Sequence, residues 1–259
     1  MIDSRAIYVI TLRELIKLGR QKGSLINTFV RPILWLFVVG SGLSQIVQRG
    51  GPVSYKQFMF PGIMGMVILF SSIFSSISIV WDREFGFLRE ILVAPISRLS
   101  IVIGKVISGT LSSSLQAAVI MIFLPLLGIH VRISQLLGLL ALAILLSFAL
   151  TSLGILIAAH LETFGVFNVI MNLLVMPLFF LSGAIYPVNL LPFGLRFLSR
   201  CNPLTSGIDA FKNVLRPRVG VSGHGSLGAE FPLGLDILVV ALFSLAMISL
   251  AVASFRRIQ

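Results

Sequence analysis

The chain has 259 residues, of which 57% are hydrophobic and only 11% are charged. A soluble domain is about 25% charged, so this composition excludes a compact soluble protein, a disordered chain and a coiled coil. The net charge of +11 does not indicate nucleic-acid binding, because the basic residues lie between long apolar runs and not on one polar face. Basic residues beside membrane spans set topology and contact anionic headgroups, so we expect an integral membrane protein with lipid as its main solvent.

The first segment, residues 3–22, has the pattern of a helix that lies on the membrane surface. An apolar stripe on one face and a basic stripe on another are typical of an interfacial helix. An ordinary juxtamembrane tail is the alternative. The apolar stripe consists of Tyr8, Leu12, Leu15, Ile16 and Gly19, and the basic stripe consists of Arg13, Lys17 and Arg20.

Six stretches are long and apolar enough to cross a bilayer, which takes about 20 residues of helix. They lie near 27–47, 57–81, 101–128, 134–158, 164–185 and 233–254. An even number of spans places both termini on the same side of the membrane. That side carries about 11 Lys and Arg residues and the other side 8. Since the cytoplasmic side of membrane proteins is richer in Lys and Arg, this count favours cytoplasmic termini. We therefore expect an all-α, single transmembrane domain over residues 1–259.

The inner loop after the second span is too polar to cross the membrane and too apolar for a plain linker. Phe85, Leu88 and Leu92 are spaced i, i+3, i+7 and share a helical face. Asp82 and Glu84 are predicted near the N-terminus of that helix, where negative charge is favourable. We expect a short amphipathic helix below the membrane, whose apolar face either rests on headgroups or fills a groove on a partner.

The apolar run of the fifth span continues but is interrupted by Gly183, Pro187 and Pro192. Non-helical backbone at membrane depth needs cover from protein or a water-filled cavity. This pattern predicts a short re-entrant helical hairpin that dips into the outer leaflet, as part of an outer hairpin and loop over residues 186–231. A short helix follows inside it, with Asn202 as its N-cap and Pro203 at its first position.

The spans contain uncharged polar residues in place of charges. Candidates to line a substrate path are Asn168, Asn172, Ser75, Ser113 and Gln116. Asn168 and Asn172 are the stronger pair, because they are spaced i, i+4 and buried amides are costly without partners. Small and hydroxyl residues also mediate helix packing in lipid, and that alternative stays open.

Mid-span charges, typical of stand-alone secondary transporters and channels, are missing from the sequence pattern. Arg31, Lys105, Glu162 and Asp236 all lie near predicted span ends. No phosphate-binding loop of the known types is present either. A secondary transporter or channel is the main alternative function, and an intramembrane enzyme is the third.

Three segments together resemble one family, the membrane subunits of ABC type-2 exporters. The likeness is closest to the small bacterial permeases that export drugs, lipo-oligosaccharides or polysaccharides. The segments are Phe58-Met-Phe-Pro-Gly-Ile63, the inner loop from Glu84 to Arg98 followed by Gly104-Lys105, and Leu181-Ser-Gly-Ala-Ile-Tyr-Pro187 with Leu191-Pro192 and Asn202-Pro-Leu204.

This resemblance implies export of an amphiphilic or glycosylated substrate across a bacterial inner membrane. Two copies of the permease would form the path, in contact with membrane lipid. Two copies of a separate cytosolic ABC ATPase would bind ATP and Mg, so this chain would carry no cofactor, no metal and no catalytic residue. The N-terminal helix would also touch the ATPase. The implied ATPase-coupling residues are Glu84, Phe85, Gly86, Leu88, Arg89 and Glu90, and the implied outer gate is Tyr186, Pro187 and Pro192.

Overall fold

The computed structural model describes residues 3–20, 55–87, 96–215 and 229–257, together with the single positions 30, 34 and 38. Every regular element within these ranges is helical, and they contain no strand. The all-α prediction is confirmed for the described residues. The first predicted span, 27–47, falls outside them except for the three single positions.

Three described helical segments are long and apolar enough to cross a membrane, namely Phe58–Glu84, Ile133–Ala158 and Leu233–Phe255. They correspond to the predicted spans at 57–81, 134–158 and 233–254. The first combines α4 (Tyr55–Ser75) and α5 (Ile77–Glu84), the second is α8 (Ile133–Ala158), and the third belongs to α12 (Leu233–Arg257).

The two other predicted spans are helical but differ in composition or length. Helix α7 (Arg98–Met121) has 24 residues, about 36 Å at 1.5 Å per residue, yet its lysine and its run of hydroxyl residues make it less apolar than the three spans above. Helix α9 (Phe164–Phe180) has 17 residues, about 26 Å. It ends before the predicted 185 because the chain turns at Gly183, whose φ of +71° belongs to a region that glycine adopts without steric cost.

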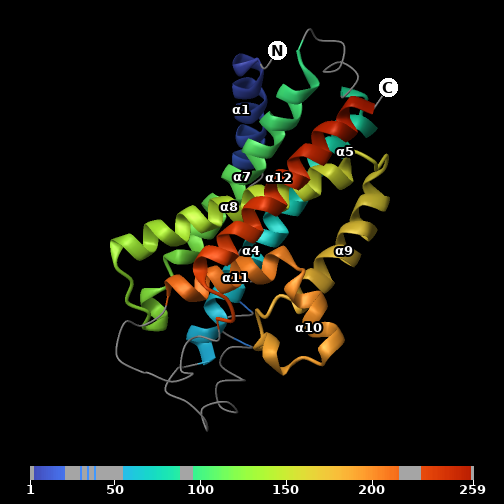
Figure 1. Ribbon diagram of the computed structural model, residues 1–259. Coiled ribbons are helices and arrows are strands. Elements are labelled where there is room, and N and C mark those ends of the chain that lie inside the picture. Colours follow the sequence, from blue (N-terminus) through green and yellow to red (C-terminus); the bar gives the residue numbers. More distant parts are fainter. Residues whose placement is uncertain are drawn as a thin grey trace.

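Helix α4 lies at the centre of the bundle (Figure 1). Residues 59–69 are all buried, as expected for a helix that is apolar on every side. Helices α7, α8, α9 and α11 (Pro203–Val214) pack around it, and α12 packs along α8. The core therefore forms around α4, with Phe60, Phe167 and Phe211 among its fully buried side chains.

Small residues let the helices approach closely. A Cβ atom at Gly109 of α7 would lie 2.5 Å from Thr151 Cγ2 of α8 and 3.3 Å from Ser75 Cβ of α4. Such contacts are typical of helix packing in lipid, where association depends on close fit. Gly109 thus marks the point where α4, α7 and α8 meet.

The region after α9 folds back onto the bundle as short helices. They are η3 (Val188–Leu190), α10 (Phe193–Arg200) and α11, and a further turn, η2 (Pro125–Leu127), follows α7. The Asn202 side chain accepts a hydrogen bond of 3.0 Å from the Leu204 amide, and Pro203 occupies the first position of α11. The predicted cap is confirmed.

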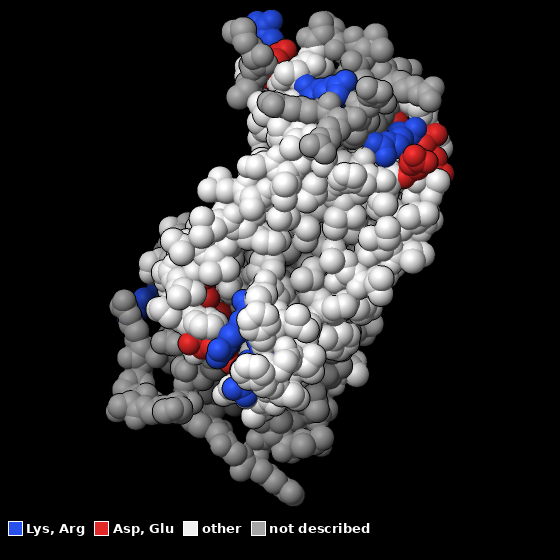
Figure 2. Space-filling model, turned by 45° about the vertical axis from the view of Figure 1, so that its right-hand side comes forward, with Lys and Arg blue, Asp and Glu red and all other residues white. Residues whose placement is uncertain are grey.

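Charged residues gather at the two ends of the molecule on the face shown in Figure 2, and a broad zone without charges separates them. This distribution matches a protein whose middle is surrounded by hydrocarbon. The start of α1 (Ser4–Arg20) and the end of α12 lie at the same end (Figure 1). We call this end the termini end.

Helix α1 packs on α7 and, as described from Ser4 to Arg20, lies within the predicted N-terminal helix over residues 3–22, whose place on the membrane surface stays a prediction. Its side that faces α7 includes Thr11, whose hydroxyl donates to the Gly104 carbonyl over 3.2 Å. The predicted apolar stripe points away from the protein, with Tyr8, Leu12 and Ile16 exposed. Of the basic stripe, Arg13 and Lys17 lie beside the end of α5 and Arg20 is exposed, and Ile7 and Ile10 lie against Gly104 of α7, so α1 attaches through both charged and apolar contacts.

Candidate functional site

The described part of the predicted coupling segment, residues 84–87, lies at the termini end. Helix α5 ends at Glu84, Phe85 forms a turn, Gly86 has a φ of +79°, and the chain is helical again at Phe87. This corrects the predicted start of the amphipathic helix, because Asp82 and Glu84 belong to the last turn of α5, and Phe85 lies in the turn that separates α5 from the helical Phe87. Spacing alone did not register the break that Gly86 allows.

Phe85 is highly exposed in this turn, with 81% of its surface accessible. An exposed aromatic side chain at a turn is the kind of anchor that a partner's groove can bury. The other implied coupling residues, Leu88, Arg89 and Glu90, lie outside the described residues. The structure therefore places Glu84, Phe85 and Gly86 together at one exposed turn.

A buried group of charges joins three helices directly behind this turn. Lys105 Nζ of α7 lies 2.6 Å from Asp82 Oδ2 of α5 and 2.7 Å from Glu14 Oε1 of α1. It also donates to the Ser78 hydroxyl over 3.0 Å. Arg13 Nη2 reaches Asp82 Oδ1 at 3.2 Å. These contacts fix the relative positions of α1, α5 and α7.

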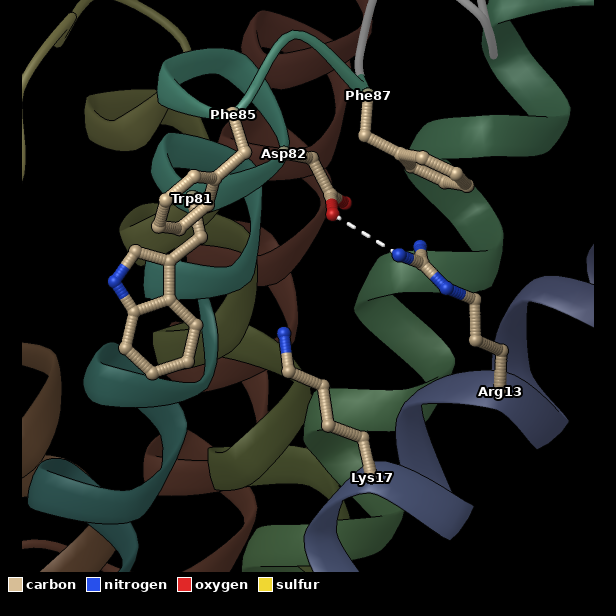
Figure 3. Close-up of a pocket in the computed structure, with 6 residues that line it drawn as sticks. All are labelled: Arg13, Lys17, Trp81, Asp82, Phe85 and Phe87. Carbon is tan, nitrogen blue, oxygen red and sulfur yellow. Dashed lines mark hydrogen bonds and ion pairs between the residues drawn. The ribbon is translucent and has the colours of Figure 1, made fainter.

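A pocket of about 510 Å³ opens between α1 and the end of α5. Figure 3 shows Trp81 and Phe85 on one side, Arg13 and Lys17 of α1 on the other, and Phe87 above Arg13. The Lys17 Nζ atom lies 4.7 Å from the centre of the Trp81 ring, and the Arg13 guanidinium carbon lies 4.2 Å from that of Phe87. Both are cation–π distances. The lining residues are Arg13, Lys17, Trp81, Asp82, Phe85 and Phe87.

The end of α5 is also tied to the turn between α8 and α9. The Arg83 guanidinium donates to the carbonyls of Leu161 and Ala159 over 2.8 and 2.9 Å. Glu84 accepts from the Phe164 amide at the start of α9 over 3.2 Å. The two residues before Phe85 are therefore bonded directly to the turn between α8 and α9 and to the start of α9.

Three of the predicted path residues lie inside the bundle between α4 and α7. The Ser72 hydroxyl donates to Ser113 over 2.9 Å, and Ser113 donates to the Gly109 carbonyl over 2.5 Å. The Ser75 hydroxyl donates to the Ser72 carbonyl. Gln116 is buried, and its Oε1 atom has no hydrogen-bond partner in the structure.

The two asparagines lie elsewhere, on a side of α9 that faces away from the core. Asn168 donates to the Phe164 carbonyl over 3.2 Å, and Asn172 donates to the Asn168 carbonyl over 2.8 Å. The core side of this helix is apolar and includes Phe167 and Met171. The predicted path residues thus form two separate sets, one internal and one on the surface of the single chain.

The predicted gate residues form a compact turn at the opposite end. The Tyr186 hydroxyl donates to the Phe180 carbonyl over 2.6 Å. Pro187 and Pro192 precede η3 and α10 as their N-cap residues. The Asn202 side chain donates to the Leu178 carbonyl over 2.7 Å and ties the hairpin to the last turn of α9.

A second polar group at this opposite end surrounds α11. Asp209 accepts from the amides of Glu230 and Phe231 over 2.9 and 2.8 Å. Lys212 is buried and donates to the Gly183 carbonyl over 3.0 Å. Burial lowers the pKa of Lys212 to about 8, and the negative charges of Asp209 and Glu230 oppose that shift.

Comparison with known proteins places this arrangement in a family. The family model described as ABC-2 type transporter matches residues 5–215, which is most of the chain. The chain belongs to the ABC-2 type transporter family. The match includes the charged group, the turn at Phe85 and the gate residues.

Named relatives agree with the family. The chain is 33% identical over 210 residues to a putative transport permease, ycf38, of Cyanophora paradoxa, covering 80% of this chain and 72% of that protein. It is 29% identical over 205 residues to nodulation protein J of Rhizobium leguminosarum bv. trifolii, covering 78% of each. A probable multidrug ABC transporter permease, YbhR, of Escherichia coli is 28% identical over 172 residues, covering 62% of this chain and 44% of that protein.

Membership of this family makes the chain a transport permease of the membrane and implies association with an ABC ATPase. Permeases of this kind are non-catalytic. The sequence resemblance to ABC type-2 membrane subunits is therefore confirmed.

Sequence reasoning missed both polar groups. The sequence pattern places Lys105 near the end of a span and Asp82 near the start of the inner-loop helix. No pattern pairs either residue with Glu14. Asp209 carried a usable signal, because an acidic residue within an apolar stretch of a membrane protein needs a partner. That signal predicts that Asp209 has a polar partner but does not identify the partner.

Proposed function

We propose that this ABC-2 permease is the membrane subunit of an ATP-driven exporter that moves an amphiphilic or glycosylated substrate, such as a drug, a lipid-linked saccharide or a polysaccharide. ATP and Mg bind to a separate cytosolic ATPase, two copies of which serve two copies of this chain in a bacterial inner membrane. Both termini lie in the cytoplasm. The Lys/Arg bias supports this side, and the position of both chain ends at one end of the bundle (Figure 1) is consistent with it.

The observation that carries the proposal is the exposed turn at Phe85 on a rigid base. The buried ion pairs of Asp82 hold α5 to α1 and α7, and Arg83 and Glu84 hold it to the start of α9. A force applied by a partner at Phe85 would reach two membrane helices without first deforming a flexible loop. This is the property that a coupling contact requires.

The surface of α9 supports a path shared by two copies. Val169 and Leu173 are 69% and 74% exposed and adjoin Asn168 and Asn172. A second permease placed against this face would cover the apolar residues and enclose the two amides. Amides within an apolar wall suit a substrate that has both polar and apolar parts.

The test is replacement of the exposed aromatic anchor. Phe85→Ala should weaken ATPase binding by roughly 30-fold, because truncating a hot-spot residue typically costs about 2 kcal/mol. Co-purification of the ATPase and substrate-stimulated ATP hydrolysis are the measurements. We expect Phe85→Ala combined with Leu88→Ala to detach or uncouple the ATPase while the permease still inserts.

A matched control is available at the end of the molecule opposite the termini end (Figure 1). Phe193 is 88% exposed at the start of α10, so Phe193→Ala removes a similar exposed ring far from the proposed contact. It should leave ATPase binding unchanged. Wild-type binding and hydrolysis in the Phe85 variants would contradict the coupling role.

A further inference from the structure

The pocket at the termini end is lined by two cations and one carboxylate, and it adjoins the buried group of Lys105 and Glu14. Lys105 and Arg13 each approach both Glu14 and Asp82, at distances from 2.6 to 3.6 Å. Lys17 has no carboxylate among these described contacts and is placed only over the Trp81 ring. Among the described residues of this group, three cations therefore face two carboxylates, and the ammonium of Lys17 can donate to an incoming anion.

The walls of the pocket determine what kind of anion fits. Trp81, Phe85 and Phe87 supply aromatic surface, and aromatic residues beside cations are typical of the level of lipid headgroups. A small inorganic ion would leave this surface without contacts. A headgroup with glycerol and ester groups beneath its phosphate would fill it.

The pocket continues into the lipid-facing stripe of α1. Leu12 and Ile16, both exposed, directly precede Arg13 and Lys17 in the helix, roughly 100° away around its axis at 3.6 residues per turn. An amphiphile can therefore place its acyl chains on this stripe while its head enters the pocket. A carboxylate of a soluble partner would gain nothing from the stripe.

We propose that this pocket binds the phosphate headgroup of an anionic phospholipid from the adjacent leaflet, with Lys17 as the main phosphate contact and Trp81 and Phe85 as its walls. The bound lipid would hold α1 against the end of α5, next to the proposed coupling turn. The proposal depends on the chain residing in a membrane and not on the transported substrate or on the ATPase.

Native mass spectrometry of the purified permease in neutral detergent tests the site without the ATPase. We expect phosphatidylglycerol to bind more tightly than zwitterionic phosphatidylethanolamine. Lys17→Gln should weaken phosphatidylglycerol binding by about fivefold, the equivalent of ~1 kcal/mol per basic residue. Lys17→Arg should retain it, which separates loss of charge from misfolding.

Arg5→Gln is the matched control, since Arg5 lies exposed in the first turn of the same helix and does not line the pocket. It removes the same charge and should change the affinity by less than twofold. Equal binding of the two lipids, or equal loss in Lys17→Gln and Arg5→Gln, would overturn the proposal. So would equally tight binding of inorganic phosphate, which would make the pocket a site for free anions. Unchanged lipid binding in Lys17→Gln together with loss of ATPase co-purification would assign the pocket to the protein partner instead.

Discussion

Lys105 shows how a single side chain can connect three helices, α1, α5 and α7, at the termini end of a membrane protein. Its side chain is only 3% exposed, and its ammonium contacts carboxylates from two other helices. Desolvation of buried charges is costly, and their mutual attraction offsets it only when the geometry and the remaining hydrogen bonds are good. Here the Ser78 hydroxyl supplies a third contact, so the ammonium is well satisfied.

Lys105→Met should therefore lower the free energy of unfolding by about 3–5 kcal/mol, because it leaves Asp82 as a buried carboxylate with only the partly exposed Arg13 as its partner. The measurement is denaturant or thermal unfolding of the purified permease in detergent. Adding Asp82→Asn should recover part of the loss, since it removes the uncompensated charge. Arg5→Met, which removes an exposed cation from α1, is the control, and an equal effect of both single changes would contradict a structural role for the ion pairs.

The helices themselves associate through small and hydroxyl residues. From the sequence alone, the serines of the second and third spans are equally consistent with lining a substrate path and with packing one helix against another. In the structure, Ser72 and Ser113 bond to each other where α4 meets α7, and Gly109 lies against Thr151 and Ser75. These contacts favour the packing interpretation for Ser113, while the half-buried Asn168 and the exposed Asn172 lie on a side of α9 away from the core.

Gly109→Ala should separate α7 from α8 and lower stability by about 1–3 kcal/mol, the usual cost of overpacking. The same change at Gly165 in the first turn of α9, where a Cβ atom meets nothing within 4 Å, should be neutral or slightly stabilising, because alanine is the better helix former. Thermal midpoints of the two variants in one detergent give the comparison. Equal midpoints would show that the helices adjust without cost.

At the scale of the whole molecule, hydropathy predicted where the apolar helices lie, but it predicted the end residues correctly for some helices and not for others. The predicted 134–158 and the observed Ile133–Ala158 agree because polar residues flank a continuous apolar run. The predicted end of the fifth span was wrong, since residues beyond Phe180 are still apolar while the turn at Gly183 depends on backbone conformation. The contacts of Lys105 with residues 23 and 91 positions away depend on how whole helices pack, and no local pattern contains that information.

The arrangement of the whole chain predicts which cysteines a membrane-impermeant maleimide can reach. Cys201 is free, exposed and placed at the end of α10, opposite the termini end (Figure 1). If the termini are cytoplasmic, as the Lys/Arg bias favours, Cys201 should react in intact spheroplasts. Arg5→Cys, introduced together with Cys201→Ser, should react only after the membrane is opened, because Arg5 is exposed at the other end of the bundle. Labelling of Arg5→Cys in intact spheroplasts would show that the topology is the reverse of the one proposed. The turn at Phe85 would then lie outside the cell membrane, where no cytosolic ATPase could reach it.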